Sequence, residues 1–265
     1  MKRRSAVLLT GVVLAAGCGG GGGNAQGILR QTAARLGQIR SGTLDFRLVV
    51  DPRGRTARGK IGFELHGPFA LRPQGSLPVL AITYTQLAGS NHATGKLVSN
   101  GTSAYAESNG RRVTLDAVQL AELRAATAQI QSNGGLGQFR IDDWIKHPSV
   151  SDGGEVGGAS TDHVTADLDV VAAANDLLAL GPGLGSSGPE LRGRNAKQLA
   201  DAVRDSSFDL WTGKKDRLLR RLRVSADLGL DVPQDLARAL GDVVGAKVTF
   251  ELAVSHPNRP VNVNP

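Results

Sequence analysis

The sequence is poor in several residue types that would otherwise point to a function. Its 265 positions include one cysteine, one methionine and only 4% aromatic residues. A single cysteine excludes an internal disulfide framework and a cysteine-built zinc site. Few aromatic side chains argue against a surface that stacks the bases of single-stranded nucleic acid. The net charge is +7, and without the three basic residues at 2–4 it is about 7 − 3 = +4, which is mildly basic. We therefore expect no nucleic-acid partner.

Sequence motifs for catalysis and cofactor binding are also missing. The five histidines are scattered without an H-E-x-x-H motif, and no G-x-S-x-G motif occurs. The run from Gly183 to Gly188 matches G-x-G-x-x-G, but it precedes Pro189 and does not open a helix after a strand. We expect no enzyme, no catalytic residue, no metal and no cofactor, although a triad assembled from distant segments would leave no motif.

Long apolar runs are absent, and the longest one lies at the N-terminus. Basic residues 2–4 precede a short apolar stretch over residues 5–14 and then Leu14-Ala-Ala-Gly-Cys18. This order is typical of an export signal, and the apolar stretch is too short for a stable membrane span. The segment resembles a bacterial lipobox, which implies removal of residues 1–17 and a diacylglycerol thioether on Cys18. The alternatives are an ordinary signal peptide with an incidental cysteine, or an uncleaved anchor.

The rest of the chain divides into a glycine-rich tether at 18–26 and a single domain at 27–265. A helix is expected over 26–39, because Ile28, Thr32, Leu36 and Ile39 repeat at spacings of three and four. The apolar period then changes to two, which is typical of strands. Strands are expected near 44–50, 61–65, 79–87, 96–98, 103–107, 111–115, 161–170, 208–211, 218–228 and 248–254.

Turns and helices separate these strands. Asn100-Gly101 and Asn109-Gly110 are strong hairpin turns, and Asp116 is a candidate N-cap for a helix reaching residue 131. Further helices are expected at 141–146, 171–180, 195–203 and 233–240. Because helices do not alternate strictly with strands, the pattern favours an α+β fold whose sheet is large, curved and antiparallel.

The order of these elements resembles the LolA-like and LppX/LprG-like bacterial envelope lipoproteins. The segments that carry the resemblance are 97–105, 141–148, 157–164, 211–224 and 254–263. The resemblance implies an incompletely closed half-barrel with helices on its concave side and an apolar cavity between them. Relatives bind acyl chains of lipids, glycolipids or lipoproteins there and carry them through the envelope.

Strand alternation supplies candidate residues for lining such a cavity. The same residues would also suit a solid core, so alternation by itself leaves both arrangements open. The candidates are Leu44, Phe46, Leu48, Ile61, Phe63, Leu65, Val79, Ala81, Val164, Leu168, Val248, Phe250 and Leu252.

One basic cluster stands out, and it includes Lys214, Lys215, Arg217 and Arg221. Positive charge near a membrane attracts anionic head groups. The alternative is a solvated hairpin edge that blocks pairing with other sheets.

The expected function is therefore a monomeric lipoprotein on the outer face of a bacterial membrane. Its ligand would be a lipid or an acylated molecule, and an envelope transport protein would be its partner. The alternative is a periplasmic sensor that binds a membrane protein, because LolA-like folds also occur in stress sensors. A surface hydrolase is a third hypothesis.

Overall fold

The computed structural model describes residues 21–54, 59–73, 75–132, 134–179, 191–229 and 244–263. The helices in these ranges are α1 (Gly21–Arg35), α2 (Ala117–Ser132), α3 (Val170–Ala179) and α4 (Gly193–Ala202), with short 3₁₀ turns at Leu36–Gln38 and Gly135–Gln138. The strands are β1 (Ser41–Arg53), β2 (Ile61–Ala70), β3 (Val79–Ala88), β4 (Asn91–Asn100), β5 (Ala104–Ser108), β6 (Arg111–Thr114), β7 (Ile145–Val156), β8 (Ala159–Leu168), β9 (Val203–Gly213), β10 (Leu219–Leu228) and β11 (Gly245–Ser255).

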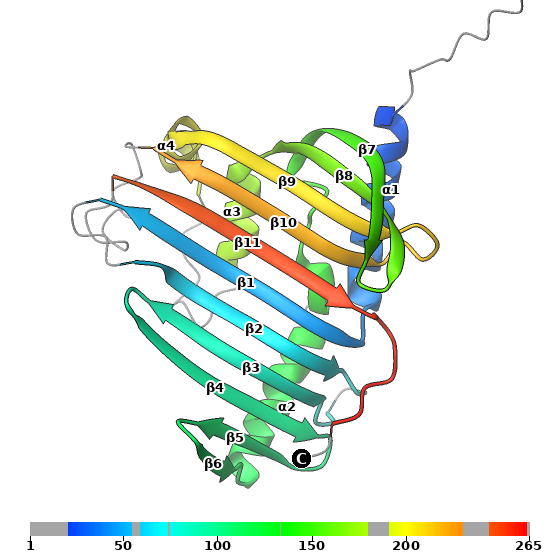
Figure 1. Cartoon of the computed structure of the whole chain (residues 1–265), viewed down its shortest axis with the longest axis vertical. Helices are drawn as coiled ribbons and strands as arrows, with labels where there is room; N and C mark the ends of the chain where they lie inside the picture. Colours follow the sequence, from blue (N-terminus) through cyan, green and yellow to red (C-terminus); the bar gives the residue numbers. More distant parts are fainter. Residues whose placement is uncertain are drawn as a thin grey trace, which may run out of the picture.

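All these strands form one antiparallel sheet in the order β6-β5-β4-β3-β2-β1-β11-β10-β9-β8-β7 (Figure 1). The last strand, β11, pairs between β1 and β10 and so joins the two meanders of the chain. The two edge strands, β6 and β7, lie at opposite ends, so the sheet stays open. The predicted incompletely closed antiparallel sheet is confirmed.

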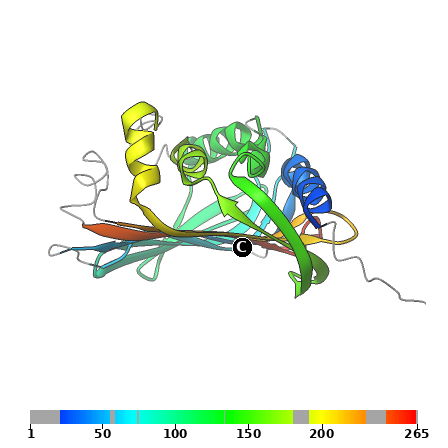
Figure 2. The ribbon, with the colours of Figure 1, turned by 90° about the horizontal axis from the view of Figure 1, so that it is seen from above.

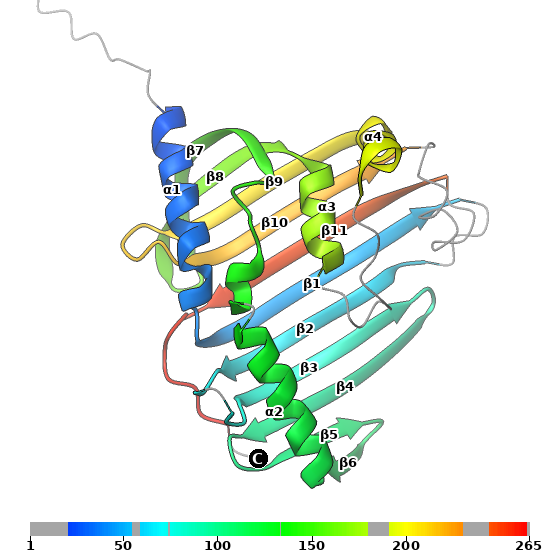
Figure 3. The ribbon, with the colours of Figure 1, turned by 180° about the vertical axis from the view of Figure 1, so that it is seen from behind.

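The helices lie on one side of the sheet, which we call the inner face (Figure 2). In Figure 3, α1 crosses the sheet near β7, α3 lies over its middle, and α2 lies over the end that carries β5 and β6. The opposite side, the outer face, carries no helix in the described part of the chain. The β7–β8 hairpin bends away from the helices, so its tip reaches past the sheet (Figure 2).

The N-terminal helix packs as its apolar spacing predicts. Ile28, Thr32, Leu36 and Ile39 are all buried. Thr32 Oγ1 lies 3.0 Å from the Ile28 carbonyl oxygen and 2.8 Å from Thr212 Oγ1, so its buried hydroxyl is satisfied. The helix begins at Gly21, earlier than expected. Residues 21–26, which we expected to be part of the tether, are therefore the first turns of α1.

Two glycines in β2 permit a close approach of neighbouring strands. Gly62 and Gly67 have φ angles of +150° and +142°, which other residues rarely adopt. A Cβ atom on Gly67 would lie 2.0 Å from the Ala81 carbonyl oxygen, and one on Gly62 would lie 2.1 Å from the Leu48 carbonyl oxygen. The central strands can therefore hold this geometry only with glycine at both positions.

Local signals for α2 and for the β5–β6 turn are confirmed. The Asp116 carboxylate accepts a hydrogen bond from the Gln119 backbone N–H at 2.9 Å, and the Gln119 side chain accepts one from the Asp116 N–H at 3.0 Å. This reciprocal pair is a capping box. Asn109 and Gly110, with φ angles of 51° and 72°, form the two-residue turn between β5 and β6.

One strand was missed from the sequence. We expected a helix over 141–146 that ends at His147-Pro148, whereas residues 145–156 form β7. Pro148 is tolerated there because β7 is an edge strand, and its pairing with β8 contains two register shifts. Its polar, glycine-containing sequence hides the alternation on which strand prediction relies. The helix expected over 233–240 lies outside the described residues.

Candidate functional site

The inner face of the sheet is mainly apolar in its central strands, and it is covered unevenly. Over β8–β11, most inner side chains are buried beneath α1, the 136–144 segment and α3, and those of β7 are partly buried. Phe250 is 1% exposed, and Trp144 is completely buried. The Trp144 indole N–H donates to Asp176 Oδ2 of α3 at 2.9 Å, which satisfies the only polar atom of that ring. This half of the molecule is a solid core.

Aromatic rings lead from this core toward an open region. Phe250 meets Phe46 edge-on at 5.5 Å between ring centroids, Phe46 stacks on Phe63 at 5.3 Å, and Phe63 lies 6.4 Å from Tyr84. The four residues belong to β11, β1, β2 and β3, which are consecutive in the sheet. Phe250 is buried, Phe46 and Phe63 are half-buried, and Tyr84 is 40% exposed. The apolar surface thus continues beyond the part that helices and loops bury.

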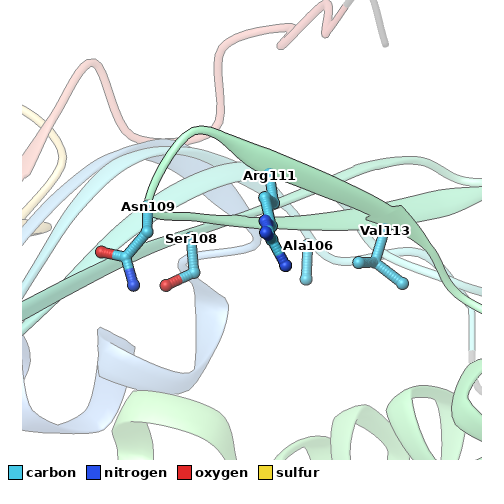
Figure 4. A pocket seen from close by; sticks show the side chains of 5 residues that line it. All are labelled: Ala106, Ser108, Asn109, Arg111 and Val113. Atoms are coloured by element: carbon cyan, nitrogen blue, oxygen red, sulfur yellow. The ribbon is translucent and has the colours of Figure 1, made fainter.

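An open pocket lies on the inner face at the β6 edge. Its volume is about 600 Å³, and Ala106, Ser108, Asn109, Arg111 and Val113 line it. Figure 4 shows these side chains pointing from the β5–β6 hairpin toward the helices. Between this hairpin and β3, the inner residues of β4 are mostly short, such as Ala93, Gly95 and Ser99. Short side chains leave room between the strands and the helix layer.

Helix α2, which lies over this end of the sheet, covers it incompletely. Among its residues only Thr127 is buried. Val118 and Ile130 are exposed. The tightly packed half and the loosely covered half therefore meet near β1 and β2.

Most of the predicted cavity residues lie on the inner face. Three of them, Val164, Phe250 and Leu252, belong to the solid core, and Val248 packs beside Ala226 and Leu228. Those at the transition or in the open half are partly exposed. They are Leu44, Phe46, Leu48, Ile61, Phe63 and Leu65, while Leu168 packs at the core margin.

Val79 and Ala81 were placed on the wrong face. In the register, Phe63 pairs with Gln86, Leu65 with Tyr84 and Phe69 with Leu80, so the even-numbered residues of β3 face the helices. Val79 and Ala81 are on the outer face. Both faces of β3 carry apolar residues, so alternation alone could not tell which face points inward. The inner residues that the sequence analysis missed are Leu80, Ile82 and Tyr84.

The predicted basic cluster is largely neutralised. Lys214 contacts Asp152 at 3.0 Å, Arg217 pairs with Asp162, and Arg221 lies 3.4 Å from Glu251. Lys215 is exposed and has no carboxylate partner among the described residues. The cluster therefore offers less free positive charge than its sequence suggests.

Neighbouring groups keep the acidic partners of this cluster ionised. The Gly154 backbone N–H and the Lys214 ammonium hold the pKa of the Asp152 carboxyl below its usual range. Burial alone would raise the pKa of Asp216, but hydrogen bonds from Arg220 and from the Leu218 N–H lower it. Both carboxylates stay charged at neutral pH and compensate the nearby cations.

The outer face carries a row of charges that alternate in sign from β2 to β9. Glu64, Arg47, Glu251, Arg223 and Asp209 follow one another in register from β2 to β9. A second pocket of about 440 Å³ lies here, bounded by this charged surface and by residues 156–157 at the tip of the β7–β8 hairpin. Its mixed, paired charges make it a poor surface for an acyl chain.

The predicted lipidation site, Cys18, lies outside the described residues. In the part of the chain that the structure covers, no helix combines the length and apolar character needed to cross a bilayer.

The fold is similar to that of LprF from Mycobacterium bovis, with a TM-score of 0.50 and 15% sequence identity over 93% of this chain and 99% of LprF. Lipoprotein LppX of Mycobacterium tuberculosis aligns over 91% of this chain and 99% of its own length, with 14% identity and a TM-score of 0.41. No protein-family model and no curated sequence matches the chain. The similarity to LprF confirms, at the level of the fold, the predicted resemblance to the LppX/LprG-like lipoproteins.

The contrast between the two halves gives a stability prediction. Phe208→Ala removes a ring that is completely enclosed, and it should lower the free energy of unfolding by about 3–5 kcal/mol. Phe63→Ala in lipid-free protein should cost only about 1–2 kcal/mol, because that ring already borders open space. Urea unfolding of both variants measures the difference.

Loading the protein with lipid should change the loss of unfolding free energy caused by Phe63→Ala, but not the loss caused by Phe208→Ala. A ligand that contacts Phe63 stabilises the folded wild type by mass action, so the loss caused by Phe63→Ala should grow after loading. Large and equal losses for both variants in the lipid-free state would contradict an open site at Phe63.

Proposed function

We propose that this chain is a lipid-anchored extracytoplasmic protein that binds acyl chains on the open half of its inner face and carries them through the cell envelope. The observation that supports this most is the continuous apolar surface from Phe46 and Phe63 to Tyr84, which ends in an open pocket and not in a packed core. Exposed apolar patches of this kind mark ligand or membrane contacts in soluble domains.

The free energy of transfer explains why such a surface suits a carrier. Exposing an acyl chain to water costs about 0.8 kcal/mol per CH₂ group, or about 12 kcal/mol for sixteen carbons. An apolar site that shelters the chain offsets most of this cost, so net transfer from a bilayer approaches zero. When the net free energy of transfer is close to zero, the acyl chain can be both loaded and released, and no catalytic group is required.

The anchor would hold the site close to its membrane. Only two residues separate Cys18 from the first residue of α1. The fifteen residues of α1 rise about 22 Å along the helix axis. The basic cluster meets the far end of this helix, where Arg35 donates to the Asp216 carbonyl oxygen at 2.5 Å. The anchor, and not the basic cluster, is therefore the main membrane attachment in this proposal.

A pair of substitutions on β3 tests acyl binding. Ile82 is on the inner face and Thr83 is on the outer face of the same strand. Ile82→Asp should weaken binding of a diacylglycerol with a pyrene-labelled chain at least about tenfold, because an acyl chain would desolvate the new carboxylate. Thr83→Asp, the matched control, should leave pyrene fluorescence titrations unchanged. Equal affinities of both variants, or no binding by the wild type, would refute the proposal.

The anchor has its own test. Cys18→Ala removes the atom to which diacylglycerol would be attached, so the protein should move from the membrane fraction to the soluble fraction. Fractionation followed by mass spectrometry of the N-terminus measures this. A variant that stays membrane-bound with residues 1–17 still attached would show that the apolar N-terminal segment is the anchor.

A further inference from the structure

The inner face of strands β1–β6 carries a single charged residue. In the register of these strands, every other inner side chain is apolar or uncharged, from Leu44 in β1 to Val113 in β6. The exception is Arg111, which pairs with Ser108 on the inner side of the β5–β6 hairpin. Its side chain lines the open pocket and points toward the helices (Figure 4).

Arg111 also lacks the compensation that other arginines of the sheet have. On the outer face, Arg47 contacts Glu64 at 3.1 Å and Arg223 contacts Glu251 at 3.3 Å. The neighbouring Arg112 lies over the Tyr105 ring, 3.4 Å from its centroid. Arg111 has no carboxylate or aromatic partner within the described ranges. A guanidinium left unpaired at the end of an apolar surface is suited to an anionic ligand.

The surroundings of Arg111 supply further donors. The Ser108 hydroxyl and the Asn109 amide line the same pocket. Phosphate oxygens accept hydrogen bonds from this combination of guanidinium, hydroxyl and amide groups.

The apolar and the cationic parts are aligned across the sheet. Arg111, Ser108, Gly95 and Tyr84 occupy one register row on β6, β5, β4 and β3. Three strand spacings separate Arg111 from Tyr84, about 14 Å. Gly95 and Ser108 present little bulk in between. A chain lying along this row would pass from the aromatic series to the guanidinium.

We propose that the ligand is an anionic amphiphile, a lipid with a phosphate head group held by Arg111 and an acyl chain on the surface that leads to Tyr84. This inference rests on the proposed function and adds the charge of the ligand to it. The polar donors and the apolar surface are continuous, so one amphiphile can satisfy both.

The experiment compares two ligands that differ only in the phosphate group. Monolauroyl glycerol and lauroyl lysophosphatidic acid displace the neutral dye Nile red from the full chain, below their micelle concentrations. The wild type should bind the phosphate-bearing ligand about fivefold more tightly, the scale of an exposed ion pair. Arg111→Gln should abolish this preference without changing the affinity for monolauroyl glycerol.

Arg112→Gln is the matched control, since it removes the same charge from the same strand on the outer face. It should keep the full preference, and inorganic phosphate alone should displace no dye. Equal loss of preference in both variants, or no preference in the wild type, would overturn the head-group assignment. If neither ligand displaces Nile red, the acyl site itself is refuted. Circular dichroism of each variant verifies that it folds.

Discussion

The structure depends on the burial of one face of the sheet. The described helices and the segment around Trp144 bury only part of that face. Most side chains on one side of the eleven-stranded sheet are apolar or short. Among the described residues, α1, α3 and the segment around Trp144 enclose this face only over β8–β11 and part of β1. The enclosed half buries Phe208, Phe250 and Leu252 and supplies the hydrophobic stabilisation of the fold. The other half can then stay open without loss of the native structure, which is the condition for a removable apolar ligand.

The distribution of charge follows from the same division. The outer face is solvated, and its cations are matched by carboxylates on neighbouring strands, as in the series Glu64, Arg47, Glu251 and Arg223. On the inner face of β1–β6, Arg111 is the single charged residue, and it lies at the edge where the pocket opens. Charges on the outer face are compensated by their neighbours, whereas an uncompensated charge beside apolar surface is suited to an anionic ligand.

The sequence predicted what local patterns encode. The stripe of α1, the capping box at Asp116, the Asn109-Gly110 turn and the antiparallel sheet all follow from periods and turn residues, and the structure confirms them. The inward face of β3 and the strand β7 did not follow. The inward face of β3 depends on its register with β2, and alternation within β3 cannot reveal it because both faces of that strand are apolar. Strand β7 is a polar edge strand whose Pro148 is tolerated only because one side of it is unpaired.

The candidate site was less predictable than the fold for a physical reason. Alternation identifies residues that avoid water, such as Phe250 and Phe63, but it does not reveal how closely a helix covers them. That depends on the short residues of β4 and β5 and on the loose seating of α2, which are tertiary properties. Arg111 was not singled out, because two arginines after an Asn-Gly turn have no unusual sequence context.

Site-specific photo-crosslinking measures most directly whether the open inner face holds acyl chains. A benzoylphenylalanine is introduced at Tyr84, which faces the helices, or at Thr83, which faces outward, and each full-length variant is irradiated in cells. Mass spectrometry of the purified protein then identifies covalent adducts. We expect lipid adducts at position 84 and none above background at position 83. Folded protein without lipid adducts at position 84, or with equal adducts at both positions, would contradict it.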